Sequence, residues 1–352
     1  MASNGSTIVP ADLYRHFFET FQSTVNVNDP LPVKVGSHSI RENEVDGEIV
    51  DWTLQYLQQK NCPSKLLAHL ASLILWEVRF CISKDDVDGA FLNNQKFESL
   101  CTELSFSNRT LHPVSVHAIR NGRRKMEDRH VVIQDLNKIC SIRDDVPTSY
   151  YAVFDGHAGT DAAFYAASQL HEKLVSNPKF ATEPSEALRE AFLATDLAFV
   201  TEHENERLKG GTTAVVSLIR GNLLLTAWLG DSQAVLVKDG VATQLVNPHK
   251  PDRIDEKERI SNLGGEVIFW DGAYRVNGQL AVSRAIGDAG YKPYVTAEPD
   301  MVAMTLDGQE DFLIIGCDGL WDTIGVDESA FIVLQYLHHE RGGEEDSIES
   351  LD

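Results

Sequence analysis

The sequence is poor in basic residues, has no closely spaced cysteines and contains no long uninterrupted apolar run. Lys and Arg total 31 against 53 Asp and Glu, which gives a formal net charge of −22 over 352 residues. Such an excess of negative charge repels nucleic acid and anionic lipid surfaces. It argues against nucleic-acid and membrane partners, and it suits a protein that gathers cations.

The cysteines predict no disulfide framework, because they lie far apart and form no C-x-x-C pair. An odd, scattered set of five is typical of a reducing compartment. The first residues lack a basic segment followed by an apolar run, so no secretory signal is expected. The most apolar stretch, 66–80, is too short and too interrupted by charge to cross a bilayer. We expect a cytoplasmic protein, with a nuclear pool allowed.

Composition and the spacing of apolar residues divide the chain into three parts. Residues 1–110 are expected to be a helical N-terminal region, because apolar residues recur at helical spacing over 42–57 and 63–80. Residues 111–340 are expected to form the main domain. Residues 341–352 are acidic and polar and are expected to be a tail.

The main domain contains short runs rich in Val, Ile, Tyr and Phe, which predict strands. These runs are 114–119, 131–133, 150–154, 213–219, 223–229, 234–237 and 312–317. Turn residues at 220–222 and 238–240 predict hairpins and therefore antiparallel pairing. Helical spacing marks 161–176, 185–202, 255–263 and 327–338. Clustered strands with separately grouped helices predict an α+β sandwich.

Carboxylates stand at the ends of several of these apolar runs. Asp155, Asp231 and Asp318 each follow a run and adjoin a glycine, and Glu127 and Asp128 precede the run at 131–133. A carboxylate at the end of a buried strand is unfavourable unless it is paired or bound to a metal. Each Asp alone suits a turn or a helix cap. As a set they indicate a site for a hard ion such as Mg²⁺ or Mn²⁺, which prefers oxygen ligands.

Two further residues near these carboxylates could act on a phosphate ester. His157 follows Asp155 by two positions; a lone His is more often structural, but beside a metal-binding Asp it can protonate a leaving group. Arg123 precedes Glu127 by four positions; it is either on a solvated face or a bidentate clamp for phosphate. No Gly-Lys-Ser/Thr or G-x-G-x-x-G follows the strand at 150–154, so nucleotide binding has little support.

Six segments in this order carry a family resemblance. They are RKMEDRH (124–130), YAVFDGHAG (151–159), GTTAVVSLI (211–219), AWLGDSQAVL (227–236), RVNGQLAVSRAIGD (275–288) and CDGLWD (317–322). Together they closely resemble the metal-dependent protein serine/threonine phosphatases of type 2C, over roughly 113–340. Upstream, DPLP and ENEVDGEIVDW further resemble the branch of calmodulin-dependent protein kinase phosphatases and partners of PIX. The resemblance implies two antiparallel sheets flanked by helix pairs.

The resemblance also implies metal ligands. Asp155 would bridge two Mn²⁺ or Mg²⁺ ions, and the backbone carbonyl of Gly156 would bind one of them. Asp318 would ligate an ion, and Glu127 and Asp128 would contact metal-bound waters. These roles come from matching motifs in this sequence with those of the family.

The same matching implies the remaining roles. Asp231 and Asp322 would form a looser site for a third ion. Arg123 would hold the substrate phosphate, and His157 would protonate the departing Ser or Thr oxygen. Residues 248–290 would form a flap beside the cleft.

The implied function is hydrolysis of phosphoserine and phosphothreonine by attack of a metal-bridged hydroxide. The implied substrates are phosphorylated proteins, kinases above all, and PIX-type exchange factors are further expected partners. The family normally continues to a Gly-Ser-x-Asp-Asn motif and closing strands, whose Asp is a metal ligand, and this sequence stops at Asp352 before that motif. The alternative is therefore a catalytically impaired or noncatalytic binding protein of the same fold.

Overall fold

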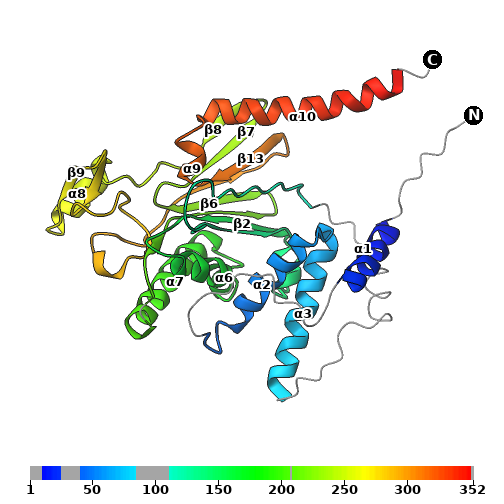
Figure 1. Ribbon diagram of the computed structural model, residues 1–352, viewed down its shortest axis with the longest axis horizontal. Coiled ribbons are helices and arrows are strands. Elements are labelled where there is room, and N and C mark those ends of the chain that lie inside the picture. Colours follow the sequence, from blue (N-terminus) through cyan, green and yellow to red (C-terminus); the bar gives the residue numbers. More distant parts are fainter. Residues whose placement is uncertain (1–9, 25–39, 85–110, 207, 350–352) are drawn as a thin grey trace, which may run out of the picture. The chain divides into compact units, whose positions relative to one another are not determined.

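The computed structural model describes residues 10–24, 40–84, 111–206 and 208–349, and the chain forms two compact units (Figure 1). The first unit consists of Met1–Ile119 and Ile133–Ser149, and the second of Arg120–Val132 and Tyr150–Asp352. The first unit thus includes a segment beyond the boundary that the sequence places at residue 110. The boundaries of the three sequence-based parts stay a prediction.

The described part of the first unit is helical, as the apolar spacing predicts. Its helices are α1 (Pro10–Thr24), α2 (Val45–Gln59), α3 (Ser64–Lys84) and the short α5 (Leu136–Ile139). The turn between α2 and α3 contains Asn61 at a φ of 55°, a left-handed conformation that Asn tolerates well. Leu57 and Leu66, on either side of this turn, are fully buried. Among the described residues, no helix is long and apolar enough to span a membrane.

The second unit contains two main antiparallel sheets. The larger has the order β1 (Arg129–Ile133), β2 (Thr148–Phe154), β5 (Ala214–Arg220), β6 (Leu223–Leu229) and β12 (Asp300–Thr305). The other has the order β13 (Glu310–Gly316), β7 (Gln233–Lys238) and β8 (Val241–Gln244). The predicted hairpin turns at 220–222 and 238–240 join β5 to β6 and β7 to β8, both antiparallel.

Side chains that alternate along β7 explain how the sheets pack. Ala234 and Leu236 lie in an apolar cluster shared with β5, β6, β12 and β13, so this cluster fills the space between the sheets. Val235 and Val237 lie in another cluster with Trp321 and with α10 (Val326–Glu349). A strand buried on both faces is apolar throughout, which is why β7 has no polar alternation.

Helices cover both outer faces of the second unit. Helices α6 (Asp161–Val175) and α7 (Pro184–Glu206) lie on the side of β2 and β6, and α10 runs along β8, β7 and β13 (Figure 1). The predicted α+β sandwich with flanking helices is therefore confirmed. Helix α10 continues to Glu349, through most of the segment that the sequence suggests is a polar tail.

Two smaller assemblies complete this unit. One is a three-stranded sheet in the order β11 (Ile286–Gly287), β4 (Gly211–Thr212) and β3 (Gly156–His157). The other is the hairpin of β9 (Val267–Trp270) and β10 (Ala273–Val276), which follows α8 (Ile254–Asn262).

One predicted strand is wrong. Residues 114–119 form no strand, and their apolar members Val114, Val116 and Ile119 are exposed. The alternating pattern there is the pattern of a half-buried strand, but burial against a neighbouring sheet is what stabilises such a strand.

Candidate active site

Asp155 and Asp318 come together at the ends of strands from the two facing sheets. Asp155 directly follows β2, and Asp318 begins the short helix α9 (Asp318–Trp321) just after β13. Ligand atoms of Asp155, Cys317 and Asp318 all lie within 4.8 Å of one another. The two aspartates that the sequence places at strand ends are thus brought together.

Three more aspartates surround this pair, and we call Asp128, Asp155, Asp231, Asp318 and Asp322 the carboxylate cluster. Burial raises the pKa of Asp155, and the negative charges of neighbouring cluster members raise it further. Burial likewise raises the pKa of Asp318, again reinforced by other members of the cluster. Crowded carboxylates with too few cations disfavour ionisation. A divalent ion among them would remove this repulsion.

Glu127 reaches the same place through its backbone. A Cβ at Gly156 would approach the carbonyl oxygen of Glu127 to 2.5 Å, so only glycine allows the segment before β1 to lie against the end of β2. This close approach carries Asp128 to the cluster, where its Oδ2 accepts a hydrogen bond from Cys317 Sγ at 3.4 Å. Glu127 and Asp128 are both half-buried.

Cys317 lies inside the cluster rather than in a strand, where the sequence suggests it. Burial raises the pKa of its thiol to about 12, and the charges of Asp128 and Asp155 contribute. Cys317 is therefore a protonated donor to a carboxylate near neutral pH. A thiol of this kind is not an activated nucleophile.

Lys250 is a cation at the cluster that sequence reasoning missed. Its Nζ forms an ion pair with Oδ2 of the buried Asp231. Burial opposes the charged form of Lys250, but the charges of Asp231, Asp322 and Asp318 raise its pKa. Asp322 itself is exposed at the end of α9. No local pattern distinguishes Lys250 from a surface lysine, because its partner lies 19 positions away.

His157 and Arg123 differ in how firmly they are held. His157 Nε2 lies 2.7 Å from Oδ2 of Asp288, a buried residue that sequence reasoning did not select. Arg123 is exposed, on the segment that leads to Glu127, and its backbone N–H donates to the carbonyl of Arg120. The guanidinium of Arg123 makes no ion pair with another residue of the described part of the chain.

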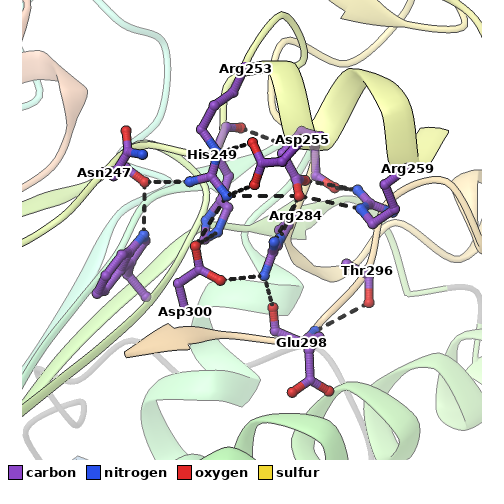
Figure 2. A network of polar contacts seen from close by, with 12 residues as sticks. Asn247, His249, Arg253, Asp255, Arg259, Arg284, Thr296, Glu298 and Asp300 are labelled. Carbon is purple, nitrogen blue, oxygen red and sulfur yellow. Dashed lines mark hydrogen bonds and ion pairs between the residues drawn. The ribbon is translucent and has the colours of Figure 1, made fainter. Parts of the chain in front are cut away.

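A second set of charges, buried or half-buried, lies between α8 and β12, and its members are paired with one another (Figure 2). Arg284 donates to Glu256 at 2.7 Å and to Asp300 at 2.8 Å, and Arg259 donates to Glu256 at 2.9 Å. Figure 2 shows Arg284 pointing between α8 and Asp300. We call the following residues the Arg284 network: Arg253, Glu256, Arg259, Arg284 and Asp300.

Comparisons with known proteins agree with this geometry. The protein phosphatase 2C family model matches residues 113–349. Mouse protein phosphatase 1E is 45% identical over 336 residues, which are 89% of this chain and 45% of that protein. Human protein phosphatase 1F is 39% identical over 358 residues, covering 92% of this chain and 79% of that protein. The chain belongs to the protein phosphatase 2C family, whose members in general depend on Mn²⁺ or Mg²⁺.

The solved structures that resemble this chain show the same fold. A structure described as a C. elegans sex-determining protein aligns with a TM-score of 0.69 at 23% identity, covering 94% of this chain and 86% of that one. The serine-threonine phosphatase 2C from Toxoplasma gondii aligns with a TM-score of 0.57 at 22% identity, covering 62% of this chain and 81% of that one. The chain spans about half the length of the protein phosphatase 1E sequences, 45% and 44% of them.

Proposed function

We propose that this protein hydrolyses phosphoserine and phosphothreonine in other proteins, with divalent metal ions. The observation that carries the proposal is the carboxylate cluster, in which Asp155 and Asp318 meet from separate sheets with raised pKa values. Half-buried aspartates in mutual repulsion suit a site that is completed by cations. Membership of the protein phosphatase 2C family supports the same chemistry.

The donor set of the cluster fits Mn²⁺ or Mg²⁺, because it consists of carboxylate and carbonyl oxygens. Asp155, the Gly156 carbonyl and Asp318 would hold two such ions directly, and Glu127 and Asp128 would help to hold them through water. Asp231 and Asp322 would hold a third, more weakly bound ion, which would take the place of Lys250 beside Asp231. When bound, the ions would activate water and neutralise charge on the phosphoryl oxygens.

The residues outside the cluster would handle the substrate itself. Arg123 is exposed on the segment that leads to Glu127, and its guanidinium would offer a phosphate bidentate hydrogen bonds. His157 would give its proton to the Ser or Thr oxygen as the P–O bond breaks, because an alkoxide is a poor leaving group. Water supplies the oxygen that ends on inorganic phosphate.

Kinases are the phosphoproteins that we propose as substrates, with PIX-type exchange factors as additional partners. This rests on the resemblance of the upstream segments alone. A cytoplasmic location with a nuclear pool is the matching proposal. Release of phosphate from phosphorylated kinases, compared with other phosphoproteins, tests the substrate class.

The decisive experiment compares two substrates and two variants in the presence of Mn²⁺. His157→Ala should lose about 10²–10⁴-fold in kcat on a phosphoserine peptide. It should lose much less on p-nitrophenyl phosphate, since nitrophenolate leaves without a proton. The exposed His117 offers a matched His→Ala control with no expected effect.

The outcomes separate the alternatives. A wild-type protein that turns over neither substrate would favour the noncatalytic binding protein and contradict the phosphatase proposal. Equal losses on both substrates in His157→Ala would leave the phosphatase intact but give His157 a structural role.

A further inference from the structure

The small sheet of β3, β4 and β11 joins His157 to Asp288. His157 pairs with Gly211 of β4, and Gly287 of β11 pairs with the same glycine from the other side. Asp288 follows Gly287 directly, so three short strands from distant parts of the chain bring the ring and the carboxyl together. Their atoms Nε2 and Oδ2 lie 2.7 Å apart.

Glycines at the centre of this sheet leave room for the carboxyl group. A Cβ at Gly211 would overlap with the side chain of Asp288, and one at Gly210 would overlap with the backbone of His157. Gly210 also has a φ of 78°, which L side chains rarely adopt. The space between the two strands is therefore filled by the Asp288 carboxyl group itself.

Asp288 is held firmly from its own backbone. Its φ is 52°, in the left-handed region, its N–H donates to the carbonyl of Gly210 at 3.0 Å, and its carbonyl accepts from Tyr291 at 2.8 Å. From α7, Asp196 accepts a hydrogen bond from the Gly287 N–H at 2.8 Å and pairs with Lys292 at 2.9 Å. Lys292 thus pairs with Asp196, and the carboxyl group of Asp288 contacts His157 instead.

The side chains of Asp288 and His157 differ in exposure, as expected when a buried residue holds a more exposed one in place. The Asp288 side chain is 3% exposed, whereas that of His157 is 26% exposed. Burial of a carboxyl group is unfavourable unless a hydrogen bond compensates it. Because a carboxylate only accepts, Nε2 of His157 must donate, which leaves Nδ1 for a second partner.

We propose that Asp288 is a positioning residue that orients the His157 ring for proton transfer from Nδ1 to the leaving oxygen. This rests on the proposed function. In the acid form of His157 both ring nitrogens carry a proton. As the P–O bond breaks, the Nδ1 proton passes to the Ser or Thr oxygen while the Nε2 proton stays hydrogen-bonded to Asp288, and Nδ1 afterwards takes up the proton that the attacking water releases. Asp288 is not part of the carboxylate cluster; its buried carboxyl group holds Nε2–H and so fixes the ring's orientation, as a buried Asp does for other catalytic histidines.

Asp288→Asn tests this, because Asn has the same size and tolerates a left-handed φ. An amide has no negative charge to stabilise the doubly protonated ring, and its NH₂ group can donate to Nε2 and so favour the neutral ring, which is a poor acid. We expect kcat on a phosphoserine peptide to fall on the order of 10²-fold with KM unchanged. Hydrolysis of p-nitrophenyl phosphate should change by less than about threefold, since that leaving group needs no proton. Asp271→Asn, an exposed Asp at a φ of 49°, is the matched control.

A double-mutant cycle guards against a structural effect. In a His157→Ala background, Asp288→Asn should cause no further loss on the phosphoserine peptide. Equal losses on both substrates, or an undiminished loss in the His157→Ala background, would overturn the proposal. Failure of the proposed function would look different, because the wild-type protein would then hydrolyse neither substrate.

Discussion

The carboxylate cluster and the Arg284 network both contain buried and half-buried acids, but in opposite electrostatic settings. Burial and neighbouring carboxylates raise the pKa of Asp155. In the network, burial opposes ionisation of Glu256, but hydrogen bonds from Arg284 and Arg259 lower its pKa to about 2. The His249 ring, 3.1 Å from the carboxylate, and the guanidinium of Arg284 lower the pKa of Asp300.

This difference indicates that the Arg284 network is structural, whereas the carboxylate cluster is a site for cations. Every acid of the Arg284 network has an arginine beside it, so the network is complete and ties α8 to the start of β12. In the carboxylate cluster, Lys250 pairs with Asp231, while Asp155 and Asp318 face further carboxylates. Unbalanced buried acids store unfavourable energy that a bound cation relieves.

The largest expected effect comes from removing an unbalanced acid. Asp155→Asn should reduce Mn²⁺-dependent hydrolysis of a phosphoserine peptide by roughly 10²–10³-fold, because several kcal/mol of charge stabilisation depends on the positioned ions. The fold should survive, since repulsion in the cluster decreases. Steady-state kinetics with thermal melts, using Asp271→Asn as control, would check this. Turnover near that of the wild type would remove Asp155 from the site.

Removing a balanced cation should instead damage the fold. Arg284→Met removes one arginine that Glu256 and Asp300 share, but Arg259 and Arg253 remain beside them. The loss of stability should therefore be smaller than the roughly 3–5 kcal/mol of an isolated buried pair. Arg275→Met is the control, because Arg275 donates to the backbone carbonyls of Trp270 and Gln279. Urea unfolding measures the difference. Equal stability of the two variants would mean that the network does not support α8.

The two regions should also respond to pH with opposite sign in metal-free protein. A folded pKa above the ordinary 3.8 means that native Asp155 binds more protons than the unfolded chain, so stability falls as pH rises through that window. Glu256 has a lowered pKa, so its contribution is lost as pH falls from 4.5 towards about 2.

Urea unfolding with a chelator from about pH 5 to about pH 8 isolates the first effect. In Asp155→Asn the free energy of unfolding should fall less steeply with rising pH in this range, because the variant has no carboxyl group at position 155 to ionise. A tenfold difference in proton affinity between the folded and unfolded chain corresponds to about 1.4 kcal/mol, which urea titration resolves. Identical slopes for the variant and the wild type would show that Asp155 ionises normally.

The smallest effect is expected at Cys317. Its thiol, with a pKa of about 12, is protonated near neutral pH, so Cys317→Ser should keep kcat within about threefold. Ser keeps a donor for Asp128. Alkylation by iodoacetamide should be slow in the folded protein. A loss comparable with that of Asp155→Asn would require a direct role for the sulfur.

Much of this architecture could be predicted from the sequence, because strand signals are local. The runs at 150–154 and 223–229 lie in strands, as does 312–317 except for its last residue, and they place Asp155, Asp231 and Asp318 at or just beyond strand ends. Strand β12 was missed because Met and Ala give its short segment a weak β signal. The segment at 114–119 shows the reverse error, an apolar alternation without a strand.

What the sequence could not show is which residues far apart in the chain become partners. His157 and Asp288 are separated by 131 positions, and Lys250 and Asp231 by 19. Nothing local distinguishes Asp288 from other aspartates after glycine. Its role follows from the pairing of β3, β4 and β11, which are two-residue strands too short to be predicted.

The account depends most on the claim that the carboxylate cluster holds divalent ions, and calorimetric titration with Mn²⁺ tests this directly. The wild-type protein and Asp271→Asn should bind Mn²⁺ alike, whereas Asp155→Asn and Asp318→Asn should lose most of that binding while remaining folded in thermal melts. Unchanged stoichiometry and affinity in the Asp155→Asn protein would contradict the account, because the ions would then lie elsewhere.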